Sequence, residues 1–206
     1  MTLSMNSVPQ GVVLEDVTWD LYRHMLTEIG DGHTRLTFDQ GRLAIMSPLP
    51  IHEQIKKVLA RLVEAYADAN DIAIEGLGST TFKREDLQKG LEPDECYYIA
   101  HAAHIAGKEE VDLAVDPPPD LVIEVDISRP GIARQPIYAA IGVPEIWKYD
   151  GTRVIPLHLI RDRYVSADQS LAFPDLPMTL VNEMVRLALT QSQTAAMKVF
   201  REWLAK

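Results

Sequence analysis

Two acidic side chains, Glu124 and Asp126, end a short apolar run, Pro119-Asp120-Leu121-Val122-Ile123-Glu124-Val125-Asp126. Such a nearly continuous run of aliphatic residues is typical of a strand that is covered on both faces. Removing a carboxylate from water is costly unless a cation or hydrogen-bond donors compensate for the lost hydration. These two acids therefore need a partner, and a metal ion is the simplest one.

A third acid, Asp94, follows Glu92 and Pro93 just ahead of another predicted strand at 96–99. If the two strands are neighbours, Asp94, Glu124 and Asp126 converge at one end of a sheet. Hard divalent cations take oxygen ligands, and Mg²⁺ typically combines one or two carboxylates with water and substrate phosphate oxygens. Such a site orients a water, lowers the pKa of that water and stabilises charge at phosphorus. The spacing thus favours phosphodiester chemistry.

The composition bounds the class of protein. The chain has 206 residues, of which 47% are hydrophobic, enough for the core of a single domain over 1–206. We expect a cytoplasmic protein without a membrane partner, because no apolar run approaches the roughly 20 residues that cross a bilayer and no leader pattern is present. The single cysteine, Cys96, excludes an internal disulfide. The net charge of −10 argues against a broad basic surface for nucleic acid, so local positive charge or a divalent ion would be needed.

The rest of the pattern predicts the elements that must position these acids. A helix is expected at 19–29, because Thr18 is a typical N-cap and Gly30 a typical stop. Pro156 suggests that its own strand lies at a sheet edge. The other predicted elements are a loose arm at 1–11, a turn at Asp31-Gly32, a hairpin at 36–45, an amphipathic helix at 51–66, strands at 72–75, 80–83, 96–99, 121–125, 145–149, 154–160 and 164–165, a loop at 128–131, and helices at 133–141, 180–189 and 195–204.

Three blocks in order resemble the Uma-type restriction endonuclease family of the PD-(D/E)XK nuclease superfamily. They are Glu92-Pro93-Asp94, then the segment from Pro119 to Ser128, then Tyr138-Ala139-Ala140-Ile141-Gly142-Val143-Pro144-Glu145-Ile146-Trp147. The resemblance runs from about residue 18 to 180. It implies an α/β fold with a restriction-endonuclease-like three-layer arrangement, in which helices surround a central mixed sheet, with an N-terminal helix and hairpin and C-terminal helices. It also implies an endonuclease that depends on Mg²⁺ or Mn²⁺ and cuts nucleic acid, with DNA as the expected substrate. A homodimer is expected by analogy with other two-strand cutters.

The resemblance assigns roles residue by residue. Asp94 is the aspartate of the first half-motif, and Glu124 is the acid of the second, with the Val125 carbonyl as a further ligand. Asp126 stands where the superfamily pattern has a lysine that positions the attacking water and offsets charge in the transition state. Either Lys83 or Arg134 replaces that lysine, or Asp126 binds a metal or acts as a base, or the site is inactive. We rank Lys83 ahead of Arg134, because lysine is the more tunable group.

Each residue also has a plainer interpretation. Asp94 could be a turn residue that bonds its own backbone, Glu124 could form a structural ion pair with Arg134, and Asp126 could cap the next turn. His52, at the start of the amphipathic helix, is either a metal ligand or proton shuttle, or an exposed first-turn histidine. Two other functions remain: a catalytically degenerate nuclease-fold binding module, and a hydrolase of a smaller phosphate ester.

Overall fold

The computed structural model describes residues 11–30, 34–127 and 131–206. The predicted arm over 1–10, the turn at Asp31-Gly32 and the loop at 128–130 lie outside the described residues.

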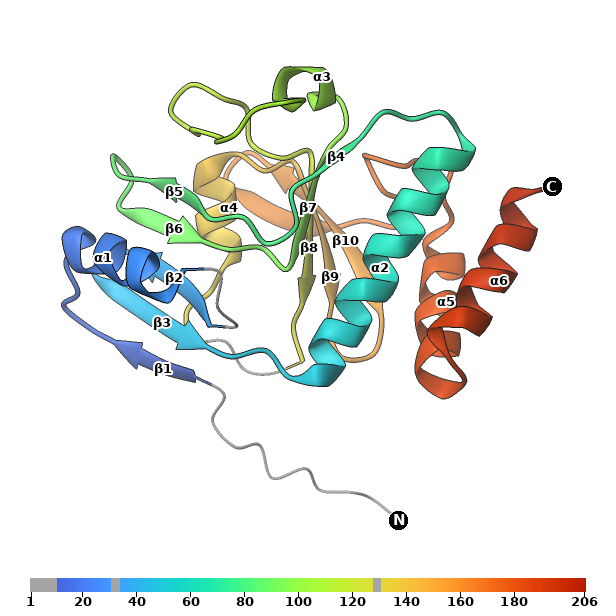
Figure 1. Ribbon diagram of the computed structural model, residues 1–206, viewed down its shortest axis with the longest axis horizontal. Coiled ribbons are helices and arrows are strands. Elements are labelled where there is room, and N and C mark those ends of the chain that lie inside the picture. Colours follow the sequence, from blue (N-terminus) through green and yellow to red (C-terminus); the bar gives the residue numbers. More distant parts are fainter. Residues whose placement is uncertain (1–10, 31–33, 128–130) are drawn as a thin grey trace, which may run out of the picture.

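The strands form two sheets (Figure 1). A five-stranded antiparallel sheet has the order β1-β3-β2-β6-β5, with β1 Gly11–Leu14, β2 Arg35–Asp39, β3 Arg42–Met46, β5 Phe82–Arg84 and β6 Lys89–Leu91. A six-stranded sheet has the order β11-β10-β9-β8-β7-β4, with β4 Glu75–Gly76, β7 Glu95–Tyr98, β8 Leu121–Val125, β9 Glu145–Tyr149, β10 Val154–Ile160 and β11 Arg163–Ser166. In this second sheet β8 and β9 run parallel and the other neighbours run antiparallel, so the predicted mixed sheet is confirmed. The hairpin predicted at 36–45 lies apart from this mixed sheet, because its strand β2 pairs with β6.

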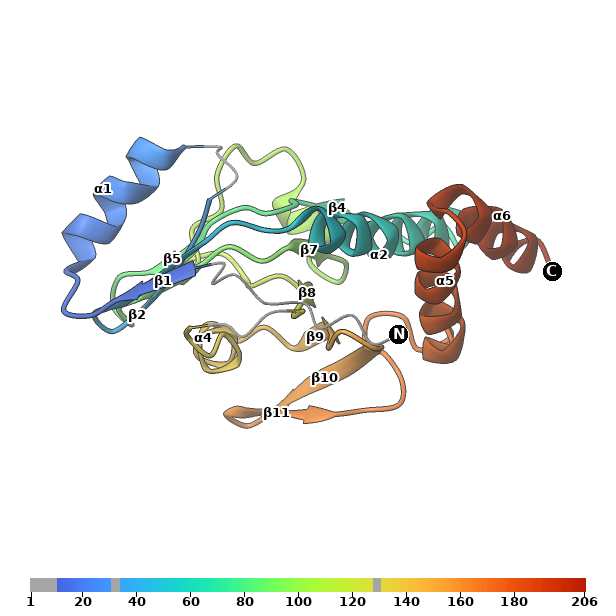
Figure 2. The same ribbon diagram turned by 90° about the horizontal axis from the view of Figure 1, so that it is seen from below.

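The helices of the described residues are α1 Trp19–Ile29, α2 Pro50–Ala69, α3 Ala102–Ile105, α4 Gln135–Ile141, α5 Met178–Thr190 and α6 Gln193–Leu204. Some of them cover both faces of the six-stranded sheet. α2 and α5 pack on one face with α6 against them, and α4 lies on the other face (Figure 2). Within the described residues, no helix combines the length and the apolar character that a bilayer span requires.

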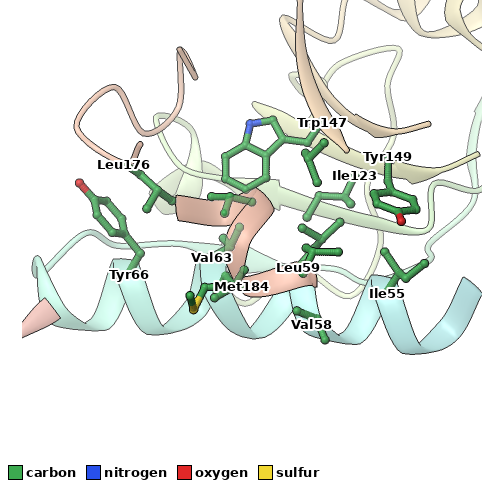
Figure 3. Close-up of a cluster of buried hydrophobic side chains, with 14 of the residues drawn as sticks. Ile55, Val58, Leu59, Val63, Tyr66, Ile123, Trp147, Tyr149, Leu176 and Met184 are labelled. Carbon is green, nitrogen blue, oxygen red and sulfur yellow. The ribbon is translucent and has the colours of Figure 1, made fainter. Parts of the chain in front are cut away.

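The long helix α2 supplies most of one core layer. Its buried stripe includes Ile55, Leu59 and Val63, which face Ile123 and Trp147 of the central strands β8 and β9 (Figure 3). These side chains recur three and four residues apart, so one face of the helix is apolar over its whole length. The packing fixes the first turn of α2 at the end of the sheet where β8 ends.

The N-terminal helix closes the five-stranded sheet. The Thr18 hydroxyl accepts a hydrogen bond from the backbone N–H of Leu21 at 3.2 Å, and Gly30 ends the helix with φ 54°, as predicted. Tyr22 stacks on Phe38 of β2 with ring centroids 4.9 Å apart. The hydroxyl end of Tyr22 lies over Gly90 of β6, where a Cβ would be only 2.3 Å from its oxygen.

Several short elements differ from the sequence prediction. The strands expected at 72–75 and 80–83 are shorter or shifted, and β1, β6 and α3 were not expected. Gly11 does not belong to a loose arm, because it pairs with Met46. Pro156 does not mark an edge strand, because β10 lies between β9 and β11. The Pro156 carbonyl accepts a hydrogen bond from Ala167 N at 2.9 Å, just beyond the end of β11. The proline therefore removes a backbone donor only at the end of the pairing between β10 and β11.

Two polar side chains, the half-buried Asn182 and the buried Glu145, anchor neighbouring segments. The Asn182 side chain clamps α5 to β10, since its Oδ1 accepts from Val154 N at 2.6 Å and its Nδ2 donates to Val154 O at 3.1 Å. Glu145, which is 0% exposed, accepts from Trp147 Nε1 at 3.0 Å and from three donors of the segment after β11. Burial raises the pKa of Glu145, and these donors oppose that rise.

Candidate active site

The candidate site lies where the chain passes from one sheet to the other. Glu92, Pro93 and Asp94 connect β6 to β7. Because Glu95 pairs with Ile123, the same antiparallel register sets Asp94 opposite Glu124. Opposite residues of an antiparallel pair point to the same face, so both carboxylates lie on the α4 side of the sheet. The structure therefore brings together the two acids that the sequence analysis singled out.

Asp94 is held through one of its two oxygens. The residue is 1% exposed, and its Oδ2 accepts from Val125 N at 2.7 Å and lies 3.0 Å from His52 Nε2. Burial alone would raise the pKa of Asp94, but the His52 hydrogen bond and nearby Arg134 hold that pKa below its ordinary value. Oδ1 is also buried and has no hydrogen-bond partner among the described residues. The interpretation of Asp94 as a turn residue bonding its own backbone is not what the structure shows.

His52 is buried. It is 4% exposed at the start of α2, so the interpretation as an exposed first-turn histidine is wrong. Burial lowers the pKa of His52, but the hydrogen bond and charge of Asp94 outweigh this and raise the pKa above its ordinary value. The opposite shifts of the two pKa values favour an imidazolium–carboxylate pair. His52 thus orients Asp94, as groups in contact with a ligand carboxylate commonly do.

Glu124 has an arginine and a tyrosine as partners. Its Oε2 lies 2.9 Å from Arg134 Nη1, and its Oε1 accepts from the Tyr138 hydroxyl on α4. Burial raises the pKa of Glu124 to about 7, against the opposing charge of Arg134. Arg134 also donates to the Glu92 carbonyl, so the guanidinium spans the connection before β7. The ion pair between Glu124 and Arg134, which was the plainer interpretation of Glu124, is therefore present.

Asp126 faces a lysine that the sequence analysis did not select. Its Oδ2 lies 2.8 Å from Lys148 Nζ. Lys148 pairs in register with Glu124 across the parallel strands β8 and β9 and lies on the same face as Ile146. The sequence did contain a signal for this ion pair, because a lysine within an otherwise buried strand needs an acidic partner.

Lys83 lies elsewhere. It belongs to β5 of the five-stranded sheet, pairs with Gly90 and lines a surface hollow beside Arg23 and His24 of α1. The structure does not bring it to Asp94 or Glu124, and nothing supports ranking it ahead of Arg134.

The donor set suits a two-carboxylate metal site better than a three-acid one. Among residues 11–30, 34–127 and 131–206, no three His, Cys, Asp or Glu side chains are grouped to hold a metal ion. Asp94 nevertheless has a buried carboxylate oxygen without a partner in that part of the chain, directly across from Glu124. Two carboxylates are an adequate protein contribution for Mg²⁺, which keeps several waters. The residues present thus fit a hard divalent ion.

Comparison with known proteins identifies the family. No curated protein sequence matches the chain. One solved structure that matches is a "putative nuclease belonging to DUF820 from Anabaena variabilis", with 13% identity and a TM-score of 0.52, covering 82% of this chain and 99% of its own. At that identity the likeness concerns the fold, and it confirms the restriction-endonuclease-like arrangement. The family model "Uma2: Putative restriction endonuclease" matches residues 19–189, which is most of the chain. The predicted resemblance is confirmed, and the chain belongs to the Uma2 restriction endonuclease family.

Proposed function

We propose that this protein is a divalent-metal-dependent endonuclease that hydrolyses phosphodiester bonds in DNA, with Asp94 and Glu124 as ligands of Mg²⁺ or Mn²⁺. The observation that carries the proposal is the placement of these two buried acids opposite each other, with one Asp94 oxygen left without a partner in the described part of the chain. A buried carboxylate oxygen of this kind is costly unless it has a ligand to bind.

The surrounding side chains hold both carboxylates in fixed orientations. His52 and the Val125 N–H bind Asp94 through Oδ2, which leaves Oδ1 for a ligand. Arg134 and Tyr138 fix Glu124, and Arg134 offsets its charge. A bound Mg²⁺ or Mn²⁺ would supply water activation and charge stabilisation at phosphorus. Fixed orientation lowers the cost of assembling the reacting groups.

The test is a cleavage assay on the full chain. Supercoiled plasmid and single-stranded DNA are incubated with Mg²⁺, Mn²⁺ or EDTA, using the unsubstituted protein, Asp94→Asn and Glu124→Gln. Two matched controls, Asp68→Asn and Glu183→Gln, change exposed acids of α2 and α5. We expect metal-dependent cutting by the unsubstituted protein and both controls, and loss of cutting in the two site variants. Cutting by Asp94→Asn at the unsubstituted rate would refute the assignment.

The second candidate is a nuclease-fold module that binds nucleic acid without cutting it. The ion pair between Glu124 and Arg134 favours it, because the pair occupies a carboxylate oxygen that a metal would need. Calorimetry with Mn²⁺ separates the two candidates. An endonuclease site should bind the ion and lose that binding in Asp94→Asn, whereas a binding module should bind DNA equally well with EDTA present.

The homodimer belongs to the same proposal. If two copies cut two strands together, sedimentation should give a dimer, and the plasmid assay should yield linear DNA early in the reaction. A monomer that only nicks would contradict this part while leaving the metal site intact.

A further inference from the structure

The pair formed by Lys148 and Asp126 is more exposed than the pair formed by Arg134 and Glu124. Lys148 lies beside Glu124 in the parallel register, and its Nζ is 2.8 Å from Asp126 Oδ2. The two side chains are 30% and 27% exposed, whereas those of Arg134 and Glu124 are 13% and 11% exposed. Among the described residues, Lys148 is therefore more accessible to a substrate than Arg134 is.

Arg134 is already committed to structural contacts. Its guanidinium binds Glu124, donates to the Glu92 carbonyl and to the Tyr138 hydroxyl, and lies over the Tyr138 ring at 5.9 Å. Moving it toward a substrate would leave the buried Glu124 carboxylate without its cation. An ammonium group instead has three donors, so Lys148 can keep one on Asp126 and offer another to a phosphate oxygen or a water.

We propose that Lys148 is a catalytic residue of the endonuclease, donating a hydrogen bond to a non-bridging phosphate oxygen, and that Asp126 is its positioning residue. The inference rests on the proposed function. Charge grows on the non-bridging oxygens as the water oxygen bonds to phosphorus and releases its proton to solvent. The bond from phosphorus to the leaving oxygen breaks, and that oxygen departs with the electron pair and takes up a proton from solvent. A fixed cation beside these oxygens stabilises the transition state more than the bound substrate, and so it raises kcat.

This role of Lys148 accounts for Asp126, which stands two residues after Glu124 where the superfamily pattern has a lysine. In this chain a cation lies on the neighbouring strand β9, where it pairs with the acid at position 126. Asp126 and Lys148 therefore act as one unit, and exchanging them should preserve a cation in the site.

Single substitutions give the first test. Lys148→Met should lower kcat for plasmid cleavage by about 100- to 1,000-fold, the usual effect of removing one preorganised transition-state donor. KM and the Mn²⁺ affinity measured by calorimetry should change little. Lys148→Arg should retain part of the activity, and Asp126→Asn should lower kcat by less than Lys148→Met does. Lys57→Met, which changes an exposed lysine of α2, is the matched control.

The exchange gives the decisive test. Asp126→Lys combined with Lys148→Asp should recover most of the activity that Lys148→Met loses, with an unchanged circular dichroism spectrum. The role of Lys148 would be overturned if Lys148→Met kept full kcat, or if a folded exchange variant were no more active than Lys148→Met. In either case, metal-dependent cutting by the unsubstituted protein would still uphold the proposed function. Absence of metal-dependent cutting by the unsubstituted protein would overturn both.

Discussion

The ion pair between Glu124 and Arg134 allows a quantitative prediction about stability. Arg134→Met removes the cation and keeps a side chain that can fill much of the same space. Glu124 then remains nearly buried, at 8% exposure, without its charge partner. Glu124→Gln removes the charge from the other side but keeps an oxygen that can accept from Tyr138. The two changes are therefore not equivalent.

The magnitude follows from the burial of the pair. Two unit charges whose centres are about 4 Å apart attract by about 4 kcal/mol at an effective dielectric constant of about 20. Removing one partner leaves the other buried and uncompensated, which typically costs about 3–5 kcal/mol. We expect Arg134→Met to fall in that range. Glu124→Gln should cost only about 1–3 kcal/mol, because Arg134 keeps its contacts with the Glu92 carbonyl and the Tyr138 hydroxyl and the nearby charge of Asp94. The double variant should cost less than the sum by at least about 1 kcal/mol, because the stranded carboxylate is gone.

Urea unfolding followed by circular dichroism, with EDTA present and at a fixed pH above the Glu124 pKa of about 7, measures all four free energies. EDTA is needed because a bound metal ion would stabilise the folded state by mass action. Arg186→Met, which changes an exposed arginine of α5, is the control and should stay within about 0.5 kcal/mol of the unsubstituted protein. An Arg134→Met variant within about 1 kcal/mol of the unsubstituted protein, below the range expected for a broken buried pair, would refute the reasoning. The reasoning would also be refuted if the cost of the double variant equalled the sum of the costs of Arg134→Met and Glu124→Gln.

Three further predictions concern other parts of the fold. Gly90→Ala should destabilise the protein by about 1–3 kcal/mol, because its Cβ would lie 2.3 Å from the Tyr22 oxygen. Tyr22→Phe should recover part of that loss in thermal unfolding, and additive effects would contradict the contact. Asn182→Asp should cost about 2–3 kcal/mol, because a carboxylate would face the Val154 carbonyl that the amide now donates to; an unchanged melting temperature would count against this clamp. Burial raises the pKa of Glu145, so the folded state binds a proton on this carboxyl more tightly than the unfolded chain does. The free energy of unfolding should therefore fall as the pH rises above the ordinary glutamate pKa of about 4.3. Glu145→Gln should therefore lose stability less steeply with rising pH in urea titrations, and an equally steep loss would contradict the prediction.

The long elements were predictable because their patterns are strong. The strands Leu121–Val125, Glu145–Tyr149 and Val154–Ile160 have the predicted bounds, since each is an apolar run of ordinary strand length beside clear turn residues. The amphipathic stripe of α2 was equally clear. The short strand Lys89–Leu91 has no such pattern, because its middle residue is Gly90. Gly90 leaves space for the Tyr22 side chain, and glycine does not favour a strand.

The acids of the site were predictable, but of their partners only Arg134 had been considered from the sequence. By itself the sequence determined that Asp94 comes just before one strand and Glu124 near the end of another, because both strands follow from local patterns, whereas their pairing was shown by the structure. Only the tertiary structure decided that Arg134 binds Glu124, that His52 is buried against Asp94, and that the lysine on this face comes from β9. Those contacts depend on strand register and on how α2 and α4 sit across the sheet, which are set by packing between segments far apart in the chain.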